Sequence, residues 1–515
     1  MPIKHPDLTL SRLSDALPAW TGEIAPASLA DICAQVRDGG GRLVALWGSD
    51  ERHQARGFAL HVTLMNETGL VCLKVRLSAE QPVYPDISHI FLAAGRMQRA
   101  TYDLLGLYPQ EGHDHRKWLR HGAWHSGSFP LRKDFDAATS LAHEPDDYPF
   151  VQVEGQGVHE IPVGPVHAGI IEPGHFRFSI IGERVLRLEQ RLGYTHKGIE
   201  KRFEGMSVQQ GAKLAGRVSG DSTVAYAWAY AMAAESIANV TPPDRALWLR
   251  ALLLERERVA NHLGDLGYLG NDVALSFGFA QFWILKEQVL RNNAALFGHR
   301  YLMDSVVPGG VAVDLDAAGK RVIEDECAML EREVHLLRRI YDEHAGVQDR
   351  FIATGRVEPK LAAQLGLCGL AGRASAQAWD ARVQFAGAPY DKLDVRMATY
   401  RNGDVAARVI VRFDELFESL RLQREILVNL LGDDIARPLE TLPGNGFGIG
   451  LVEGWRGEVL VAIHSDAEGS LARVHPHDPS WQNWPALEHA ILDNIVPDFP
   501  LINKSFNLSY SGQDL

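Results

Sequence analysis

The sequence predicts an α+β fold, with a small N-terminal α/β domain followed by a larger domain in which a bundle of long helices is flanked by β-strands. Three observations predict this fold. Short β-rich runs separated by turn residues fill the first quarter of the chain, four long stretches with helical periodicity follow, and β-rich runs return near the end. With 515 residues, the chain is long enough for two or three domains with cores of their own.

The N-terminal part alternates between helical and β-rich segments. Gly39 to Gly41 supply one turn, and Asn66 to Gly69 predict a hairpin loop between two strands. We expect helices at residues 29–37 and 97–105 and strands at 42–47, 58–64 and 70–75. An irregular tail rich in histidine follows, and Pro130 to Asp134 end the domain.

The larger part begins with short strands and then becomes helical. We expect strands at 160–163, 175–181 and 184–188, a helical run from Thr223, and long helices at 244–263, 277–301, 316–344 and 405–431. Asp244 and Asp316 suit helix starts. Strands return at 455–464 and 470–474, separated by a turn at 465–469.

Composition excludes several classes of protein. The net charge of −13 argues against non-specific binding to nucleic acid or to anionic lipid surfaces. The sequence contains no long uncharged apolar run, and its N-terminus lacks the layout of a signal peptide. We therefore expect a cytoplasmic protein without direct membrane insertion, whose membrane association runs through partners.

The four cysteines indicate neither a metal cluster nor a disulfide framework. Cys33, Cys72, Cys327 and Cys368 are far apart, and no two have a chelating spacing. We expect them to be buried as small hydrophobic side chains in a reducing compartment. The four histidines between Gly112 and His125 lack a carboxylate or thiolate at helical spacing, so a partner-docking surface is favoured there over a metal site.

Two segments could carry chemistry. The glycine-rich loop from Gly164 to Phe176 holds His167, Glu172 and His175, and a loop histidine can donate a proton to a reduced acceptor; the alternative is that these side chains only cap the loop. Ser219 and Ser222 have the spacing of a two-cysteine chelate, but hydroxyl oxygens are poor ligands for soft metals. We expect the serines to cap the following helix, and we expect the same role for the segment with Ser509 and Gly512.

A series of motifs resembles a known family. Tyr102 to Gly106, Gly112-His113 and Pro130 to Lys133 resemble the smaller hydrophilic subunit of respiratory complex I. The remaining motifs resemble its large hydrophilic subunit and the large subunit of energy-converting nickel-iron hydrogenases of the formate-hydrogenlyase type. They comprise residues 164–167, 172–177, 196–201, 255–264, 308–311, 403–408 and 456–458.

The resemblance implies a fusion of two domains. Residues 1–135 would form the complex I 30 kDa-like α/β domain, 136–158 a linker, and 159–515 a domain like the complex I 49 kDa subunit and the hydrogenase large subunit, with its long-helix bundle and flanking strands. In such hydrogenases two C-x-x-C pairs hold nickel and iron. In this sequence those positions are occupied by Ser219, Ser222, Ser509 and Gly512.

Loss of every thiolate implies that nickel is not bound, because serine and glycine do not replace a soft anionic ligand. The sequence also ends three residues after Gly512, which is expected of a member without the C-terminal extension that many such hydrogenases lose during metal insertion. In complex I, the corresponding cavity holds the head group of a quinone. His175 resembles the loop histidine that contacts the quinone, and His167 is a second candidate. The tyrosine position falls on Gly220, so Tyr226 is the candidate substitute.

Charged residues would surround the vacated metal site. The resemblance places Glu200, Asp221, Arg456 and Asp514 around it, where they could stabilise the cavity or relay protons. The chain itself would bind no cofactor, with quinone as a possible ligand and iron–sulfur clusters on a partner subunit.

We therefore expect an oxidoreductase subunit of the NADH-quinone oxidoreductase or hydrogenase-like kind, active only within its complex. It would pass electrons from the iron–sulfur small subunit to an acceptor, with a quinone as the leading candidate. Membrane antiporter-like and quinone-site subunits would hold it on the cytoplasmic side of the inner membrane. The alternative is a redox-silent scaffold that serves assembly and coupling.

Overall fold

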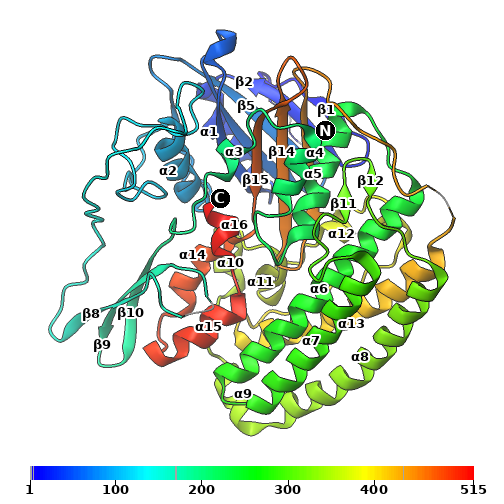
Figure 1. The fold of residues 1–515 in the computed structure, drawn as a ribbon. Coiled ribbons are helices and arrows are strands. Elements are labelled where there is room, and N and C mark those ends of the chain that lie inside the picture. Colours follow the sequence, from blue (N-terminus) through cyan, green and yellow to red (C-terminus); the bar gives the residue numbers. More distant parts are fainter. Residues whose placement is uncertain (1–2, 4, 169–170, 433) are drawn as a thin grey trace.

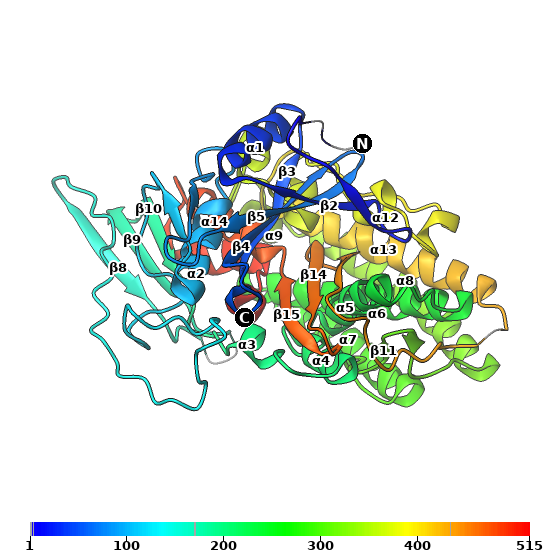
Figure 2. The same ribbon diagram turned by 90° about the horizontal axis from the view of Figure 1, so that it is seen from above.

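The computed structural model describes residues 3, 5–168, 171–432 and 434–515, and it confirms the α+β fold. A five-stranded sheet, a second sheet from the C-terminal part and a bundle of long helices make up the body of the molecule (Figure 1). The C-terminus lies centrally, between the N-terminal domain and the C-terminal sheet (Figures 1 and 2).

The N-terminal sheet has the strand order β1-β2-β5-β4-β3. Its strands are β1 (Ser11–Ser14), β2 (Ala19–Ile24), β3 (Arg42–Asp50), β4 (Phe58–Asn66) and β5 (Gly69–Leu77). The predicted hairpin is confirmed, since Asn66 pairs with Gly69 at the tip of β4 and β5. Helices α1 (Leu29–Asp38) and α2 (Ala94–Leu105) confirm the two predicted helices, and the short strands β6 (Val83–Pro85) and β7 (Tyr108–Gln110) flank α2.

A small antiparallel sheet projects from the body in both views (Figures 1 and 2). It consists of β8 (Val158–Val163), β9 (His175–Ile181) and β10 (Arg184–Arg191), close to the three predicted strands. Between Gln110 and Val158, a stretch that is described throughout, the structure has no helix or strand. The predicted linker 136–158 lies there, and its exact boundaries stay a prediction.

The predicted long helices are all present. They are α6 (Asp244–Asp272), α7 (Ser276–Phe297), α8 (Ala317–Glu343) and α13 (Val405–Asn429), and they form the bundle (Figure 1). Asp316 caps α8 by accepting a hydrogen bond from the Gly319 amide at 2.7 Å. Several short helices were not predicted: α3 (Ile199–Arg202), α4 (Val208–Ala215), α9 (Ala345–Phe351), α10 (Pro359–Leu365), α11 (Gly369–Ala374) and α12 (Ala381–Gln384).

The C-terminal sheet consists of β13 (Phe447–Glu453), β14 (Glu458–Ser465) and β15 (Leu471–His477). The prediction missed β13, and Trp455 lies in the loop before β14 rather than in a strand. Helix α5 (Thr223–Ala238) packs on this sheet at close range, because a Cβ at Gly450 would lie 1.9 Å from the Ala229 carbonyl oxygen. The chain ends with α14 (Ser480–Ala490), α15 (Phe499–Phe506) and α16 (Tyr510–Asp514).

The remaining elements are short. They are the strands β11 (Val306–Val307) and β12 (Gly310–Val311) and the 3-10 turns Pro26–Ser28, Arg52–Gln54, Tyr390–Lys392 and Val496–Asp498. All four cysteines are buried, as predicted. Among the described residues, every helix is too short or too polar to cross a membrane.

The N-terminal and C-terminal sheets pack directly against each other. Trp47 of β3 stacks on His475 of β15 with ring centroids 4.8 Å apart. Arg473 donates a hydrogen bond to the Gly48 carbonyl at 3.0 Å, and Lys133 donates one to the Ala472 carbonyl at 2.6 Å. The two parts of the chain therefore share a buried interface.

Candidate functional site: a closed pocket between α5 and α16

The two serine-containing segments meet in space, although 290 residues separate Ser219 from Ser509. Their hydroxyl oxygens lie 2.9 Å apart and share a hydrogen bond. Ser509 is held in place because its amide donates to the Ser480 hydroxyl at 2.9 Å. Ser219, Ser222, Ser509 and Gly512 are all buried, so the four positions of the predicted vacated site form one buried cluster, called the closed pocket below because its own side chains fill it.

An ion pair closes one side of this pocket. The Arg456 guanidinium donates to both Asp221 carboxylate oxygens at 2.7 and 2.6 Å and to the Asn507 carbonyl at 2.6 Å. The guanidinium also lies 3.9 Å from the ring centroid of Trp455. Burial favours a neutral carboxyl, but Arg456 outweighs it and lowers the pKa of Asp221 to about 2. Asp221 is therefore an anion at neutral pH.

A second carboxylate fills the space beside Gly512. The Tyr226 hydroxyl donates to Asp478 Oδ2 at 2.7 Å, and a Cβ at Gly512 would lie 2.4 Å from the same oxygen. Burial and the Asp478 charge raise the pKa of Tyr226 well above its ordinary value. Asp478 thus occupies the space that a side chain at position 512 would need. The neutral Tyr226 hydroxyl donates a hydrogen bond to Asp478.

The side chains of this pocket do not fit a nickel–iron centre. Such a centre needs soft, anionic ligands, whereas the pocket offers three hydroxyl groups and a glycine, and two of the hydroxyls are already bonded to each other. Across the described residues, no group of three His, Cys, Asp or Glu side chains is arranged to hold a metal ion.

The predicted capping role is correct for one serine and wrong for another. Ser509 caps α16 by accepting from the Gly512 amide at 2.9 Å. Ser222 makes no side-chain cap to α5. The Glu257 carboxyl of α6 takes that role, accepting from the Val224 amide at 2.7 Å and from the Ala225 amide at 3.3 Å. Glu257, an acceptor from another helix, therefore replaces Ser222 as the cap of α5.

Of the two loop histidines, His167 lies near α16 and His175 begins β9. His175 Nδ1 lies 3.4 Å from the Gly164 carbonyl oxygen, and His167 Nδ1 lies 3.2 Å from the Pro165 carbonyl oxygen. In both imidazoles Nε2 is buried without a hydrogen-bond partner. Burial lowers the pKa of His175. The His167 ring lies 6.2 Å from that of Tyr510, the residue after Ser509.

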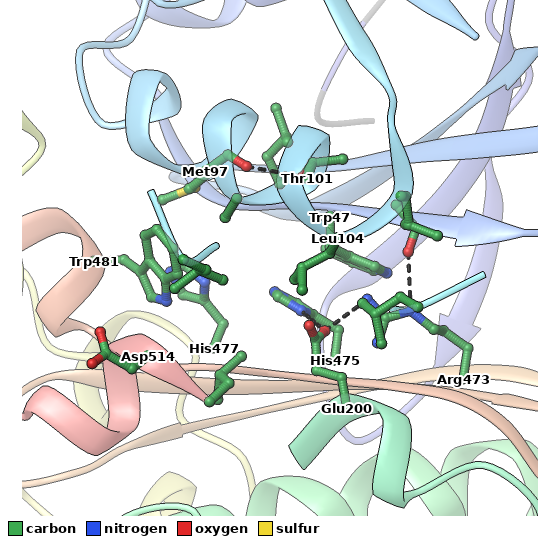
Figure 3. A pocket seen from close by; sticks show the side chains of 17 residues that line it. Trp47, Met97, Thr101, Leu104, Glu200, Arg473, His475, His477, Trp481 and Asp514 are labelled. Carbon is green, nitrogen blue, oxygen red and sulfur yellow. Dashed lines mark hydrogen bonds and ion pairs between the residues drawn. The ribbon is translucent and has the colours of Figure 1, made fainter. Parts of the chain in front are cut away.

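Glu200 and Asp514 lie apart from the Asp221–Arg456 pair. Glu200 accepts from His475 at 2.7 Å and pairs with Arg473 at 2.6 Å, near the N-terminal domain (Figure 3). Despite burial, these two partners lower the pKa of Glu200 to about 2. Asp514 accepts from the Thr195 amide at 2.9 Å, and burial raises its pKa to about 6. Of the four predicted charges, Asp221 and Arg456 line the closed pocket, while Glu200 and Asp514 border a separate cavity.

Sequence reasoning missed Asp478 and Glu257, which close the pocket and cap α5. Asp478 precedes Pro479 and Ser480 directly after a strand, a signal for a helix start that could have drawn attention to it. Glu257 lies in the run Glu255 to Arg258, whose charges fall between the apolar residues 251–254 and 259–260 of the same helix. Charges at such positions need buried partners, so the run itself was informative.

Comparisons with known proteins place this architecture in a family. Residues 23–140 match the model of the respiratory-chain NADH dehydrogenase 30 Kd subunit, and residues 272–445 match that of the 49 Kd subunit.

Several curated proteins are similar over most of the chain. Formate hydrogenlyase subunit 5 of Escherichia coli is 29% identical over 483 residues, covering 92% of this chain and 85% of that protein. The carbon monoxide-induced hydrogenase of Rhodospirillum rubrum is 30% identical over 351 residues, covering 68% of this chain and 97% of that protein. An NADH-quinone oxidoreductase subunit of Bacteroides thetaiotaomicron is 25% identical over 448 residues, covering 82% of this chain and 84% of that protein.

A solved structure shares the fold. A chain of the membrane-bound sulfane sulfur reductase, an archaeal respiratory membrane complex, matches with a TM-score of 0.66 and 24% identity, covering 70% of this chain and 99% of that chain. Fold and matches together define a complex I-like, hydrogenase-related subunit. The chain belongs to the family of the 49 kDa respiratory-chain subunit, with a 30 kDa-type domain fused in front of it.

Proposed function

We propose that this chain is a nickel-free subunit of a membrane-associated oxidoreductase complex, in which electrons from an iron–sulfur partner subunit reach an acceptor such as a quinone. The observation that carries the nickel-free part is the closure of the pocket by the Ser219–Ser509 contact and by Asp478 beside Gly512. The relatives named as hydrogenase and NADH-quinone oxidoreductase subunits support membership in such a complex.

The loop histidines are the proposed proton donors. An imidazole whose Nδ1 donates to a carbonyl takes up and releases its second proton at Nε2. His167 and His175 both have an unpaired Nε2. Either could protonate a reduced acceptor, while the closed pocket keeps the Asp221–Arg456 pair in a fixed position.

An exposed apolar face supports a partner next to this pocket. Phe277 and Ile284 of α7 are 52% and 59% exposed. Lys286 lies on the same helix. Burial lowers the pKa of its ammonium group, and the nearby charges of Asp265 and Asp221 act in the opposite direction. We assign this face to the iron–sulfur partner subunit, because a short distance between its cluster and the acceptor is required for electron transfer through this chain.

The test is made on the complex purified from membranes. We expect reduction of a quinone analogue, and we expect His175→Ala or His167→Ala to lower the rate by about 100-fold or more, the usual contribution of a general acid. His53→Ala, an exposed histidine of the N-terminal domain, is the control and should keep the rate. Full activity in both loop variants removes the proposed histidine role, and stoichiometric nickel by elemental analysis removes the nickel-free assignment.

The scaffold function is the second candidate, and the same closure favours it. A pocket filled by its own side chains needs no ligand to be stable. A scaffold predicts that the purified complex carries no acceptor and that Ser219→Ala and Arg456→Met complexes, once assembled, keep the electron transfer of the unaltered complex. A loss of electron transfer in an assembled Arg456→Met complex argues for the first proposal.

A further inference from the structure

A buried ionic network lies where α6, α11, α12, α13 and β13 meet. Its members are buried charged side chains, none more than 4% exposed: Glu255, Arg258, Arg373, Asp380, Arg382, Glu415 and Glu453. Arg373 links two of the acids, donating through Nη1 to Glu453 at 2.7 Å and through Nε to Glu415 at 2.9 Å. Arg382 links two others, pairing with Asp380 at 2.7 Å and with Glu255 at 3.1 Å.

The charges of this network do not balance. Four carboxylates face three guanidinium groups, and arginine keeps its charge in proteins. An uncompensated negative charge in a buried site is costly, and buried acids remove that cost by taking up a proton. The network therefore holds one proton more than four ionised acids would.

Hydrogen bonding identifies the acid that holds this proton. Glu255 accepts from Arg258, Arg382, Tyr390 and Ser419. Glu453 has fewer donors, since besides Arg373 it accepts only from the Ala381 amide at 3.1 Å among the bonds found in the described structure. Glu415 also has two donors, Arg373 and His262, but Glu453 in addition faces the negative charges of Asp380 and Glu458. Glu453 is therefore the least stabilised carboxylate of the network.

His262 is the other group that could hold the extra proton, but its hydrogen bonding disfavours a protonated, charged imidazole ring. Its Nε2 donates to Glu415 at 2.9 Å, whereas Nδ1 is buried without a partner. A charged imidazolium would leave that N–H donor unsatisfied in the interior. Burial lowers the pKa of His262 as well.

The groups facing Glu453 from its neighbours favour its neutral form. Asp380 precedes α12, and Glu458 of β14 pairs with Arg42 of β3. Glu255 and Arg258 approach from α6, Arg373 from α11, and the buried thiol of Cys368 lies near the Arg42–Glu458 pair. Burial, followed by the Asp380 charge, raises the pKa of Glu453 to about 7.

A large cleft gives this network access to solvent. Its volume is about 810 Å³, and it lies between residues 12–18 of the N-terminal domain, the C-terminal part of α5 and the segment 381–391. Glu453, Arg382 and Tyr390 form part of its wall. Of the network's acids, Glu453 is the one on this wall.

We propose that Glu453 is a proton-binding site that exchanges one proton with the cleft, and that Arg373 and Glu415 couple its charge to His262. When Glu453 loses its proton, its negative charge attracts the Arg373 guanidinium more strongly. The interaction of that guanidinium with Glu415 is then weakened. His262 lies edge-on to Trp455 with ring centroids 6.3 Å apart, and the Trp455 indole donates to the Asp221 carbonyl at 2.9 Å. The proposal does not depend on the acceptor or on nickel.

The first test is infrared spectroscopy of the purified complex as a function of pH. We expect the C=O stretching band of protonated carboxyls to titrate near neutral pH and to lose the contribution of one carboxyl in Glu453→Gln. Glu326→Gln is the matched control, because Glu326 is also buried and paired with an arginine, Arg256. A pH-dependent band with the same intensity in Glu453→Gln as in the unaltered complex overturns the proposal, because Glu257, the other carboxyl with a raised pKa, contributes equally to both.

The second test compares two variants of the same network. Glutamine resembles a protonated glutamate, so Glu453→Gln should keep cooperative unfolding and lose about one proton of uptake per chain when the pH falls from about 8 to about 6. Glu255→Gln removes an ionised partner of two arginines and should lower the melting temperature much more. Equal destabilisation by both variants means that Glu453 is ionised, and the proposal fails.

Discussion

At the residue scale, the pocket between α5 and α16 is closed by several small contacts rather than by one bulky side chain. Ser219 bonds to Ser509, Arg456 bonds to Asp221, and Asp478 occupies the space next to Gly512. Each contact involves a polar group whose partner is supplied by another segment. Removing one partner therefore leaves a buried donor or acceptor unsatisfied, which costs more than the bond itself contributes.

Gly512→Ala should destabilise the protein by about 1–3 kcal/mol, because the added methyl would lie 2.4 Å from Asp478 Oδ2 and 2.8 Å from Ser509 Oγ. Urea unfolding measures the change. Gly220→Ala, at an exposed position next to Ser219, is the control, since the nearest atom to its added methyl would be Met303 Cε at 3.8 Å. In an Asp478→Ala background the cost of Gly512→Ala should shrink, and an unchanged cost would contradict the steric explanation.

The sequence could predict which segments meet in this pocket but not how they are closed. The spacing of Ser219 and Ser222 and the resemblance of the chain end directed attention to four positions that do lie together. Asp478 and Glu257 act across 252 and 33 residues of sequence. Contacts of that kind depend on the packing of whole elements, so no local pattern specifies them.

At the scale of elements, the start of α5 depends on α6. The first amides of a helix have no intrahelical acceptor, and here Glu257 supplies one for Val224 and Ala225. Burial raises the pKa of Glu257 to about 8, so the side chain is largely a neutral carboxyl at pH 7. A neutral acceptor avoids a second buried negative charge near Asp221.

Glu257→Ala should lower the free energy of unfolding by about 1–3 kcal/mol, since two buried amides lose their acceptor. Glu257→Gln should cost less, because its amide oxygen can still accept a hydrogen bond and the group it replaces is mostly neutral. Thermal unfolding at neutral pH compares the two. Glu324→Ala on the exposed face of α8 should be close to neutral, and a similar loss in Glu257→Gln and Glu257→Ala would rule out the capping role.

Long periodic elements were predictable and short ones were not. Helices such as α8 and α13 show their apolar stripe over six or more turns, whereas α11 and α12 are 6 and 4 residues long and give no periodic signal. Strand β13 was missed because Gly448 and Gly450 weaken its β-character. Those glycines are needed because α5 packs against their backbone.

At the scale of the whole molecule, two opposing groups of titratable side chains set the pH dependence of stability. Burial disfavours the charged form of histidine, and it lowers the pKa of His464 and of His477 to about 3. Burial favours the neutral form of two glutamates, and it raises the pKa of Glu453 to about 7 and that of Glu257 to about 8. The buried histidines and the two glutamates therefore change the stability in opposite directions as the pH rises.

We therefore expect maximal stability near pH 6.5, because buried histidines with a lowered pKa outnumber the two glutamates. Below about pH 6.5 the unfolded state binds protons that the buried histidines cannot, so stability falls with decreasing pH. Between the ordinary glutamate pKa of 4.5 and the folded-state values of about 7 and about 8, the folded state holds protons that the unfolded state has released. The two glutamates therefore lower the stability as the pH rises through this range, by at most ~1.4 kcal/mol per pH unit for each group, and no longer do so above about pH 8. Urea unfolding from about pH 5 to about pH 9 measures both limbs.

The double variant Glu257→Gln/Glu453→Gln separates the two causes. It should remove the fall in stability above about pH 6.5 and steepen the rise below it, because the glutamates no longer oppose the histidines. If the stability of the unaltered protein does not fall between about pH 6.5 and about pH 8, both glutamates are ionised in the folded protein. In that case the buried network would contain its full complement of negative charge, and the proton on Glu453 would not exist.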